Sequence, residues 1–161
     1  MFSFSVAFDP KKGIGLNGIL PWHIKEELQL FKKNTLHKNI VMGRTTYENL
    51  PVKLVDRNIY VVSAKEDYKP EGVTIIKDLA QFLEKYSDEE TEYIICGGAS
   101  VYRQAYPYCI RGYVSFIKEE YRTDTYFDCF CQGDWNIVEK VEYEKFVYCL
   151  LERRNENGIN R

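Results

Sequence analysis

Two segments of the chain place glycine between an apolar run and a helix start, a pattern that can bind phosphate. They are Ile40-Val41-Met42-Gly43-Arg44-Thr45-Thr46 and Ile94-Ile95-Cys96-Gly97-Gly98-Ala99-Ser100. Free backbone N–H groups and the positive helix end favour an anion there, and glycine lets the backbone approach it. Arg44 and Thr46 add a charge and a hydroxyl. Tight strand-to-helix turns explain the glycines equally well, whereas two phosphate sites together fit a dinucleotide.

A carboxylate lies on the apolar stripe of the helix that we expect to begin at Ile24. Glu27 follows Ile24 by three positions and precedes Phe31 by four, so it shares their face. A buried carboxylate needs a partner, and a ligand ring that is cationic or donates hydrogen bonds would supply one. Alternatively, Glu27 lies at the edge of the stripe and pairs with Lys32 or Lys33.

Two further residues have both a functional and a structural interpretation. Trp22 follows Pro21 directly before this helix, where its indole N–H can hold a water, although a tryptophan at such a place is by default a core residue. Arg57 carries a fixed charge that can bind a carboxylate outside the pocket, but a single surface arginine is weak evidence.

The composition excludes several classes of protein. The chain has 161 residues, of which 45% are hydrophobic and 29% charged, and this predicts one compact domain over residues 1–154 with a polar tail at 155–161. A net charge of −2 without a block of basic residues argues against nucleic acid and acidic membrane surfaces as partners. No signal segment or membrane span is indicated, so we expect a cytoplasmic protein.

The cysteines and histidines do not predict a metal site. The five cysteines are odd in number and scattered, which favours reduced thiols. Cys129 and Cys131 form the one close pair, and His23 and His37 lie about 100 residues away from them.

Hydrophobic periodicity predicts alternating strands and helices. We expect strands at Phe2–Phe8, Asn39–Met42, Ile59–Ser63, Val73–Ile76, Tyr93–Cys96, Tyr113–Lys118, Trp135–Tyr143 and Phe146–Arg153. We expect helices at about Ile24–Thr35, Thr45–Asn49, Asp78–Tyr86 and from Gly97-Gly98 through Ala105, and an ordered loop over residues 13–23. This order predicts an α/β fold, with a mostly parallel sheet, helices on both faces and a C-terminal antiparallel hairpin. Ligands of such sheets bind at the carboxyl ends of the strands.

Six motifs are specific in their order and spacing, although none is specific alone. They are Ile14-Gly15-Leu16-Asn17, Leu20-Pro21-Trp22 with Glu27 and Phe31, Met42-Gly43-Arg44-Thr45-Thr46-Tyr47-Glu48, Gly97-Gly98-Ala99-Ser100-Val101-Tyr102, Asp124-Thr125-Tyr126-Phe127 and Asp134-Trp135. Together they resemble the dihydrofolate reductase family over essentially the whole chain. The resemblance implies a single-domain, eight-stranded sheet and the reduction of 7,8-dihydrofolate to tetrahydrofolate with NADPH.

The resemblance also implies catalytic roles for three residues. Glu27 would hydrogen-bond the amino group and a ring nitrogen of the pterin and favour its protonated form. Trp22 would order the water that delivers a proton to N5, and Ser115 would support the carboxylate. Bacterial members commonly have Asp in place of this Glu, and most members have Thr in place of this Ser.

Two sets of contact residues follow from the same resemblance. The substrate, or an antifolate, would contact Ala7, Leu20, Glu27, Leu28, Phe31, Leu50, Leu54, Arg57, Cys96 and Ser115, with Arg57 on the α-carboxylate of the glutamate tail. NADPH would contact Ala7, Ile14, Gly15, Leu20, Gly43, Arg44, Thr45, Thr46, Ser63, Ala64, Lys65, Cys96, Gly97, Gly98, Ala99, Ser100, Val101 and Tyr102. Arg44, Ser63 and Lys65 would read the 2′-phosphate, and residues 14–20 would close over the nicotinamide.

The sequence departs from the family pattern beside the tail-binding arginine, and two other functions compete. Val55-Asp56 replaces the usual Pro-Gly before Arg57, which places an acid where it would weaken the hold on a carboxylate. The pyrimidine reductase of riboflavin synthesis shares the fold, but would not carry Pro21-Trp22 with Glu27. A non-catalytic nucleotide-binding protein of the same fold is the other alternative, and a monomer is the expected state.

Overall fold

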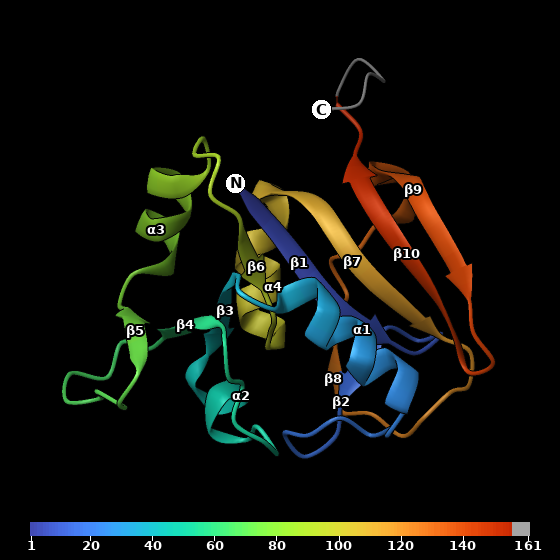
Figure 1. Cartoon of the computed structure of the whole chain (residues 1–161), viewed down its shortest axis with the longest axis horizontal. Coiled ribbons are helices and arrows are strands. Elements are labelled where there is room, and N and C mark those ends of the chain that lie inside the picture. The colour runs from blue at the N-terminus through green and yellow to red at the C-terminus, as the bar shows by residue number, and fades with distance from the viewer. Residues whose placement is uncertain (156–161) are drawn as a thin grey trace.

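The computed structural model describes residues 1–155, which form an eight-stranded sheet with helices on both faces (Figure 1). The strands of this sheet are β1 (Phe2–Phe8), β3 (Asn39–Gly43), β4 (Asn58–Val62), β5 (Val73–Ile76), β6 (Tyr93–Ile95), β7 (Cys109–Ile117), β9 (Trp135–Glu142) and β10 (Phe146–Arg153). The helices are α1 (Lys25–Thr35), α2 (Arg44–Glu48), α3 (Leu79–Tyr86) and α4 (Ala99–Ala105), with short 3-10 turns at Tyr106–Tyr108 and Gln132–Asp134. None of these helices is long and apolar enough to span a membrane.

The strand order is β5-β4-β3-β6-β1-β7-β10-β9. All pairs from β5 to β7 are parallel, whereas β10 pairs antiparallel with both β7 and β9. This confirms the predicted α/β class with its antiparallel C-terminal hairpin. Because β1, β3, β4 and β6 run in one direction, their carboxyl ends share one edge of the sheet.

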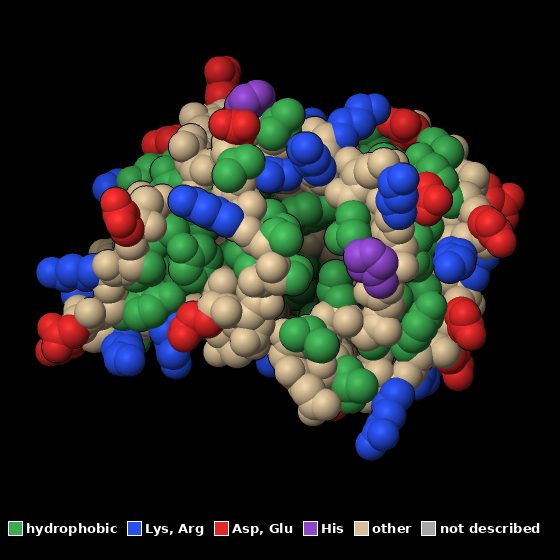
Figure 2. Space-filling view, turned by 60° about the horizontal axis from the view of Figure 1, so that its bottom comes forward, with side chains coloured by type: hydrophobic (Ala, Val, Ile, Leu, Met, Phe, Trp, Pro, Cys, Tyr) green, Lys and Arg blue, Asp and Glu red, His purple; other side chains and the backbone are tan. Residues whose placement is uncertain are grey.

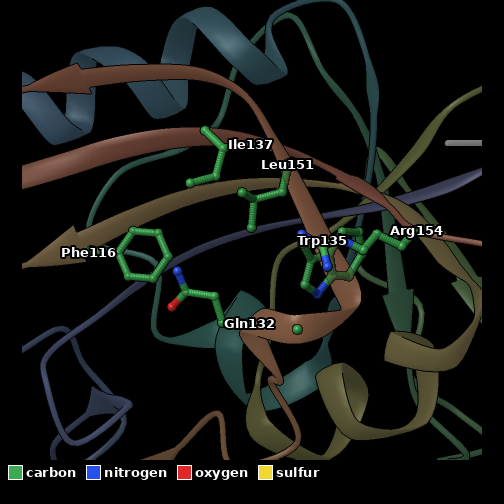
Figure 3. Close-up of a pocket in the computed structure, with 7 residues that line it drawn as sticks. Phe116, Gln132, Trp135, Ile137, Leu151 and Arg154 are labelled. Atoms are coloured by element: carbon green, nitrogen blue, oxygen red, sulfur yellow. The ribbon is translucent and has the colours of Figure 1, made fainter. Parts of the chain in front are cut away.

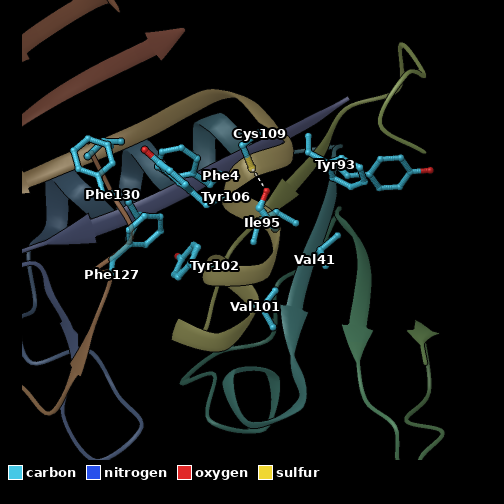
Figure 4. Packing of buried hydrophobic residues seen from close by; sticks show 14 of the residues in the cluster. Phe4, Val41, Tyr93, Ile95, Val101, Tyr102, Tyr106, Cys109, Phe127 and Phe130 are labelled. Atoms are coloured by element: carbon cyan, nitrogen blue, oxygen red, sulfur yellow. Dashed lines mark hydrogen bonds between the residues drawn. The ribbon is translucent and has the colours of Figure 1, made fainter. Parts of the chain in front are cut away.

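Alternate strand residues divide the core into two clusters, one on each face. Phe4 of β1, Val41 of β3 and Ile95 of β6 belong to a cluster that includes side chains of α3 and α4. Figure 4 shows Val101 and Tyr102 of α4 in this cluster. The strand residues on the opposite face, such as Ile40 and Ile94, pack instead with side chains of α1 and α2. The central parallel strands are therefore buried on both sides, whereas the edge strand β9 is mostly exposed.

The strand expected at Tyr113–Lys118 begins four residues earlier, at Cys109, and ends at Ile117. Glycine at position 112 masked this start because it interrupts the apolar run. The structure gives its reason: a Cβ on Gly112 would lie 2.6 Å from Cζ of Phe4. Gly112 leaves room for that buried ring inside a continuous strand.

Residues 13–23, expected as a loop, contain a short strand, β2 (Gly13–Gly15), which pairs antiparallel with β8 (Thr125–Tyr126). Three-residue strands rich in glycine carry no periodicity, which is why the sequence did not reveal the pair. The remaining predicted elements differ by a residue or so at their ends. Of the predicted tail, residues 156–161 lie outside the described part of the chain.

Candidate active site

Most of the predicted site residues converge at the edge where the parallel strands end, whereas Arg57 directly precedes β4 at the opposite edge. The edge where the strands end faces the viewer in Figure 2, which shows a hollow lined by hydrophobic side chains. α1 crosses beside it, and the first residues of α2 and α4 follow β3 and β6 into it (Figure 1). The topology thus brings together residues that lie up to about 100 positions apart in sequence.

Glu27 is one of two buried residues of α1, and one side chain, that of Ser115 in β7, hydrogen-bonds to its carboxylate. Burial raises the pKa of Glu27 to about 7, and the Ser115 hydrogen bond opposes this rise only in part. No ion pair joins Glu27 to Lys32 or Lys33 within residues 1–155, so the surface-pair alternative is wrong. A carboxyl that is half ionised at neutral pH is suited to binding a group that changes its own protonation.

Trp22 lies just before α1 and is buried, with 7% of its surface exposed. Its indole Nε1 is a buried donor without a hydrogen-bond partner among the described residues. The ring of Tyr121 packs edge-on against it at 5.3 Å between centroids. Buried donors are normally satisfied, so this N–H points to a ligand or an ordered water.

Apolar side chains of the predicted substrate pocket are left unusually open. Leu28 of α1 is 41% exposed and Leu20 47% exposed, although both lie on apolar stretches. Phe31, Leu50 and Leu54 are half-buried. Part of the apolar stripe of α1 packs in the core, and its remaining side chains are left open, as expected of a pocket that an aromatic ligand completes.

Cys96 follows β6, where the backbone N–H of Cys96 donates to Val41 O at 2.8 Å. Burial raises the pKa of its thiol to about 12, so it stays protonated. Ala7 is buried on β1, directly paired with Ser115. Ala7 thus lies on a central strand beside the hydroxyl partner of Glu27, and Cys96 directly follows another central strand.

Arg57 stands before β4 and is held in place by uncharged groups. Its Nε donates to Thr35 Oγ1 at 3.2 Å, and its Nη1 donates to Val55 O at 2.9 Å. Asp56 is exposed, adopts a positive φ of 59°, and forms no ion pair with Arg57 among the described residues. The expected weakening of Arg57 by Asp56 therefore has no support in the geometry, and the guanidinium keeps its charge for a ligand.

The two glycine turns lie against each other. Gly43 N donates to Gly97 O at 2.9 Å, and a Cβ on Gly98 would lie 3.2 Å from Thr46 Oγ1. Neither Gly43 nor Gly98 caps its helix through a side chain, so the first N–H groups of α2 and α4 remain free to bind an anion. Such a cradle fits the two phosphates of a dinucleotide.

The outer cofactor candidates follow register-paired strands. Gly43 pairs with Val62, so Arg44 and Ser63 are the residues that next leave β3 and β4. Arg44 Nη1 forms an ion pair with Glu48 at 2.7 Å and lies over the ring of Tyr68. Ser63 is buried and accepts the N–H of Lys65, whereas Ala64 and Lys65 are exposed.

Val101 and Tyr102 are placed behind the turns by their packing. Val101 contacts Gly43, and the Tyr102 ring lies under Gly97. The Tyr102 hydroxyl donates to Ser5 O at 2.7 Å, and its N–H donates to Gly98 O. Their side chains support the cradle, while Ser100, Thr45 and Thr46 leave hydroxyls near its surface.

The loop from Ile14 to Leu20 crosses the open side of the site. Leu16 and Ile19 exchange both backbone hydrogen bonds around Asn17 and Gly18, which have positive φ values of 52° and 82°. Asn17 N donates to Asp124 Oδ2 at 3.0 Å. A Cβ on Gly18 would lie 2.6 Å from Nδ2 of Asn49, so the tip of the loop rests on the end of α2.

The sequence model of the dihydrofolate reductase family matches residues 1–150. The chain belongs to this family. It is 33% identical to the dihydrofolate reductase of Bacillus subtilis, over 98% of this chain and 97% of that protein. It is 38% identical to the dihydrofolate reductase of Mycoplasma genitalium, over 83% of this chain and 86% of that protein.

A solved dihydrofolate reductase has the same architecture. The structure from Enterococcus faecalis, complexed with NADP(H) and RAB-propyl, matches with a TM-score of 0.85 and 30% identity, over 96% of this chain and 97% of that one. This agreement confirms the predicted fold down to the eight-stranded mixed sheet.

Two cavities of this dihydrofolate reductase chain lie away from the predicted site. One is lined by Phe116, Gln132, Trp135, Leu151 and Arg154 near the C-terminal hairpin (Figure 3), and the other adjoins it around Phe116 and Gln132. Neither includes Glu27 or the glycine turns. Within residues 1–155 no three His, Cys, Asp or Glu side chains group as metal ligands.

Sequence reasoning missed several residues that shape the site of this family member. Asp9 and Tyr121 received no role, and Asp124 was only part of a motif. Their contacts join residues more than 100 positions apart, Asp9 with Tyr121 and Asn17 with Asp124. The one signal available was an acid directly after a buried strand, at Asp9.

Proposed function

We propose that this chain is a dihydrofolate reductase that reduces 7,8-dihydrofolate to 5,6,7,8-tetrahydrofolate with NADPH, and so supplies one-carbon metabolism. Hydride goes to C6 and a proton to N5. The observation that carries the proposal is Glu27, a buried carboxyl with a pKa raised to about 7 and one hydroxyl partner, beside an apolar cleft and an uncapped double glycine turn. When bound, NADPH supplies the hydride.

The protein residues bind, orient and manage the proton. The Glu27 carboxylate accepts hydrogen bonds from the pterin amino group and ring nitrogen. The bound pterin thereby supplies the donors that this buried carboxylate lacks in the protein alone. Ser115 fixes its orientation. The Trp22 N–H holds a water near the ring, and this water carries the proton that Glu27 does not deliver directly.

Specificity rests on the two ends of the cleft. Arg57 binds the α-carboxylate of the glutamate tail, and Leu20, Leu28, Phe31, Leu50, Leu54, Ala7 and Cys96 enclose the rings. The residues around Gly43 and Gly97 bind the pyrophosphate, and Arg44 with Ser63 and Lys65 reads the 2′-phosphate. The loop at residues 14–20 closes over the nicotinamide and excludes water.

The protein is expected to act as a cytoplasmic monomer, with residues 1–154 as one domain, and to bind antifolates but neither nucleic acid nor membranes. The rival pyrimidine reductase and a non-catalytic nucleotide-binding protein have no use for the pairing of Glu27 with Ser115 beside an unsatisfied Trp22 N–H.

The test is the absorbance at 340 nm of purified protein with NADPH and dihydrofolate, repeated with NADH and with methotrexate or trimethoprim. A decrease that requires dihydrofolate and is blocked by an antifolate supports the reaction. Slower turnover with NADH supports Arg44 and Ser63 as readers of the 2′-phosphate. Folded protein that binds NADPH, seen as fluorescence quenching, but turns over no dihydrofolate would favour the non-catalytic alternative.

A further inference from the structure

We infer that Tyr121 is a positioning residue that fixes the Trp22 indole in the cleft, and that Asp9 and Lys11 clamp Tyr121 in place from the end of β1. The inference rests on the proposed function, because it concerns how the water-holding donor is oriented. Tyr121 belongs to neither the substrate nor the cofactor contacts proposed above.

The contact between the two rings is direct. Tyr121 and Trp22 pack edge-on, with centroids 5.3 Å apart and ring planes at 65°. Edge-to-face pairs are a preferred aromatic geometry, stabilising by about 1 kcal/mol beyond area burial. Since the indole N–H has no hydrogen-bond partner among the described residues, packing is what sets its direction. Tyr121 supplies a wall of that packing.

Tyr121 is itself held by both of its backbone polar groups. Its N–H donates to Asp9 Oδ2 at 3.1 Å, and its carbonyl accepts from Lys11 Nζ at 3.0 Å. Asp9 is 1% exposed, and its other oxygen accepts the N–H groups of Lys11 and Gly13 at 3.0 and 2.8 Å. A buried carboxylate with three backbone donors is a rigid anchor.

The anchor joins two segments that have no strand pairing at this point. Asp9 directly follows β1, and Tyr121 lies between β7 and β8, where the structure describes no regular element. Without the clamp, the segment at residues 118–124 would be free to withdraw its ring from Trp22. The contacts therefore connect Asp9, at the end of β1, to Tyr121 and through its ring to Trp22.

The fixed indole contributes to rate because an aligned donor loses less entropy when it holds a water in the reactive geometry. The ring and not the hydroxyl of Tyr121 should matter, because the contact is between rings. Tyr121→Phe keeps the ring, and Tyr121→Leu removes it. The two variants form a matched pair.

The test combines turnover with the indole N–H signals of ¹⁵N-labelled full-length protein. The chain has two tryptophans. Trp135 donates to Tyr106 and belongs to the core cluster on the other face of the sheet from Trp22 and Tyr121, so its signal serves as the internal reference. Trp22→Phe assigns the other signal. We expect Tyr121→Leu to shift the Trp22 signal and to lower kcat about fivefold with unchanged NADPH affinity. Tyr121→Phe should restore both the wild-type signal position and kcat.

The clamp is tested by Asp9→Asn and by Lys11→Met, the latter at an exposed side chain where folding is not at risk. Both should move the Trp22 signal in the same direction as Tyr121→Leu, but by less. An unmoved Trp22 signal in Tyr121→Leu, or equal losses in Tyr121→Leu and Tyr121→Phe, would overturn the inference. Wild-type turnover by Trp22→Phe would instead overturn the proposed role of Trp22, while the indole signal still decides whether Tyr121 positions it.

Discussion

Two carboxylates at opposite edges of one sheet have opposite surroundings. Glu92, just before β6 at the amino edge, accepts hydrogen bonds from Ser3 and Tyr113 at 2.8 Å and from Lys38 at 3.0 Å, with Arg111 at 3.6 Å. Burial raises its pKa, but these partners outweigh burial and hold the pKa of Glu92 below its usual value. Glu27, at the carboxyl edge, has Ser115 alone, and burial raises its pKa.

The difference shows which of the two carboxylates requires a partner from outside the protein. At the amino edge, Lys38, Glu92 and Arg111 form a closed network of opposite charges. At the carboxyl edge, Glu27 is without a counter-ion in the described chain. A buried charge without a partner costs stability, so its retention points to a partner that arrives with the substrate.

The largest expected effect is that of Glu27→Gln on activity. The amide keeps the size of the side chain but cannot hold the charge, and we expect kcat at pH 7 to fall about 100-fold or more. NADPH affinity, measured by fluorescence quenching, should stay within about twofold. Glu26→Gln is the control, because Glu26 directly precedes Glu27 in α1 and is exposed. Equal losses of turnover and NADPH affinity would break the comparison, since Glu27 would then be structural like Glu92.

Glu92→Gln should do the converse. Loss of a charge that accepts three side-chain hydrogen bonds is expected to lower the free energy of unfolding by about 2 kcal/mol. Turnover of the folded enzyme should be unchanged. Urea denaturation at pH 7 measures the first quantity, with Glu90→Gln at an exposed position as the reference. A variant as stable as wild type would show that the network adds nothing.

Arg57→Ala should mainly raise the KM for dihydrofolate, by about tenfold, because a charge-assisted bond to the glutamate tail is lost. Steady-state kinetics of this variant beside Arg103→Ala, an exposed arginine of α4, measures the effect. An unchanged KM would mean that Asp56 already prevents tail binding in solution, against the geometry described here.

Ser115→Ala should sharpen the assignment of Glu27. The Ser115 hydrogen bond lowers the pKa of Glu27, so its loss should move that pKa, and the alkaline limb of the pH–rate profile, to higher pH by about half a unit to one unit. Ser115→Thr keeps the hydroxyl and should keep the profile of the wild type. A profile unaffected by Ser115→Ala would assign the titration to another group.

The smallest effect is a pair of opposite pH slopes in stability. Because the folded pKa of Glu27 is raised to about 7 from 4.5, wild-type stability should decrease as the pH rises between these values, and Glu27→Gln should lack this decrease. For Glu92 the folded pKa is lowered, so its contribution is present above 4.5 and is lost on acidification. Slopes of at most about 1 kcal/mol per pH unit are expected in denaturation series.

Local patterns in the sequence predicted most of the fold and the residue at the centre of the site. Strand and helix order followed from periodicity, and the helix expected at Asp78–Tyr86 is found as α3, with Asp78 at its N-cap. The helix geometry of Glu27 correctly placed an acid among apolar groups. Its two interpretations could not be separated, because the deciding partner, Ser115, comes from β7 across the sheet.

What the sequence did not reveal depends on contacts between distant segments. The pairing of β2 with β8 and the clamp on Tyr121 join residues about 110 positions apart, and neither leaves a periodic pattern. Periodicity placed Leu28 and Phe31 only on an apolar stripe, and the family resemblance assigned them to the substrate pocket, where Leu28 is 41% exposed. Periodicity reports which face is apolar, not whether protein or ligand covers it.

Gly112 has a consequence for how a mutational scan of this chain should be interpreted. The Phe4 ring opposite it is 1% exposed and touches the rings of Tyr106, Phe127, Phe130 and Trp135, so it cannot yield to a new side chain. Every substitution at position 112 should therefore be depleted in a growth selection as strongly as substitutions at Glu27. Counting abundance separately from activity would distinguish the two, because variants at position 112 would disappear from the soluble pool, whereas variants at position 27 would remain in it.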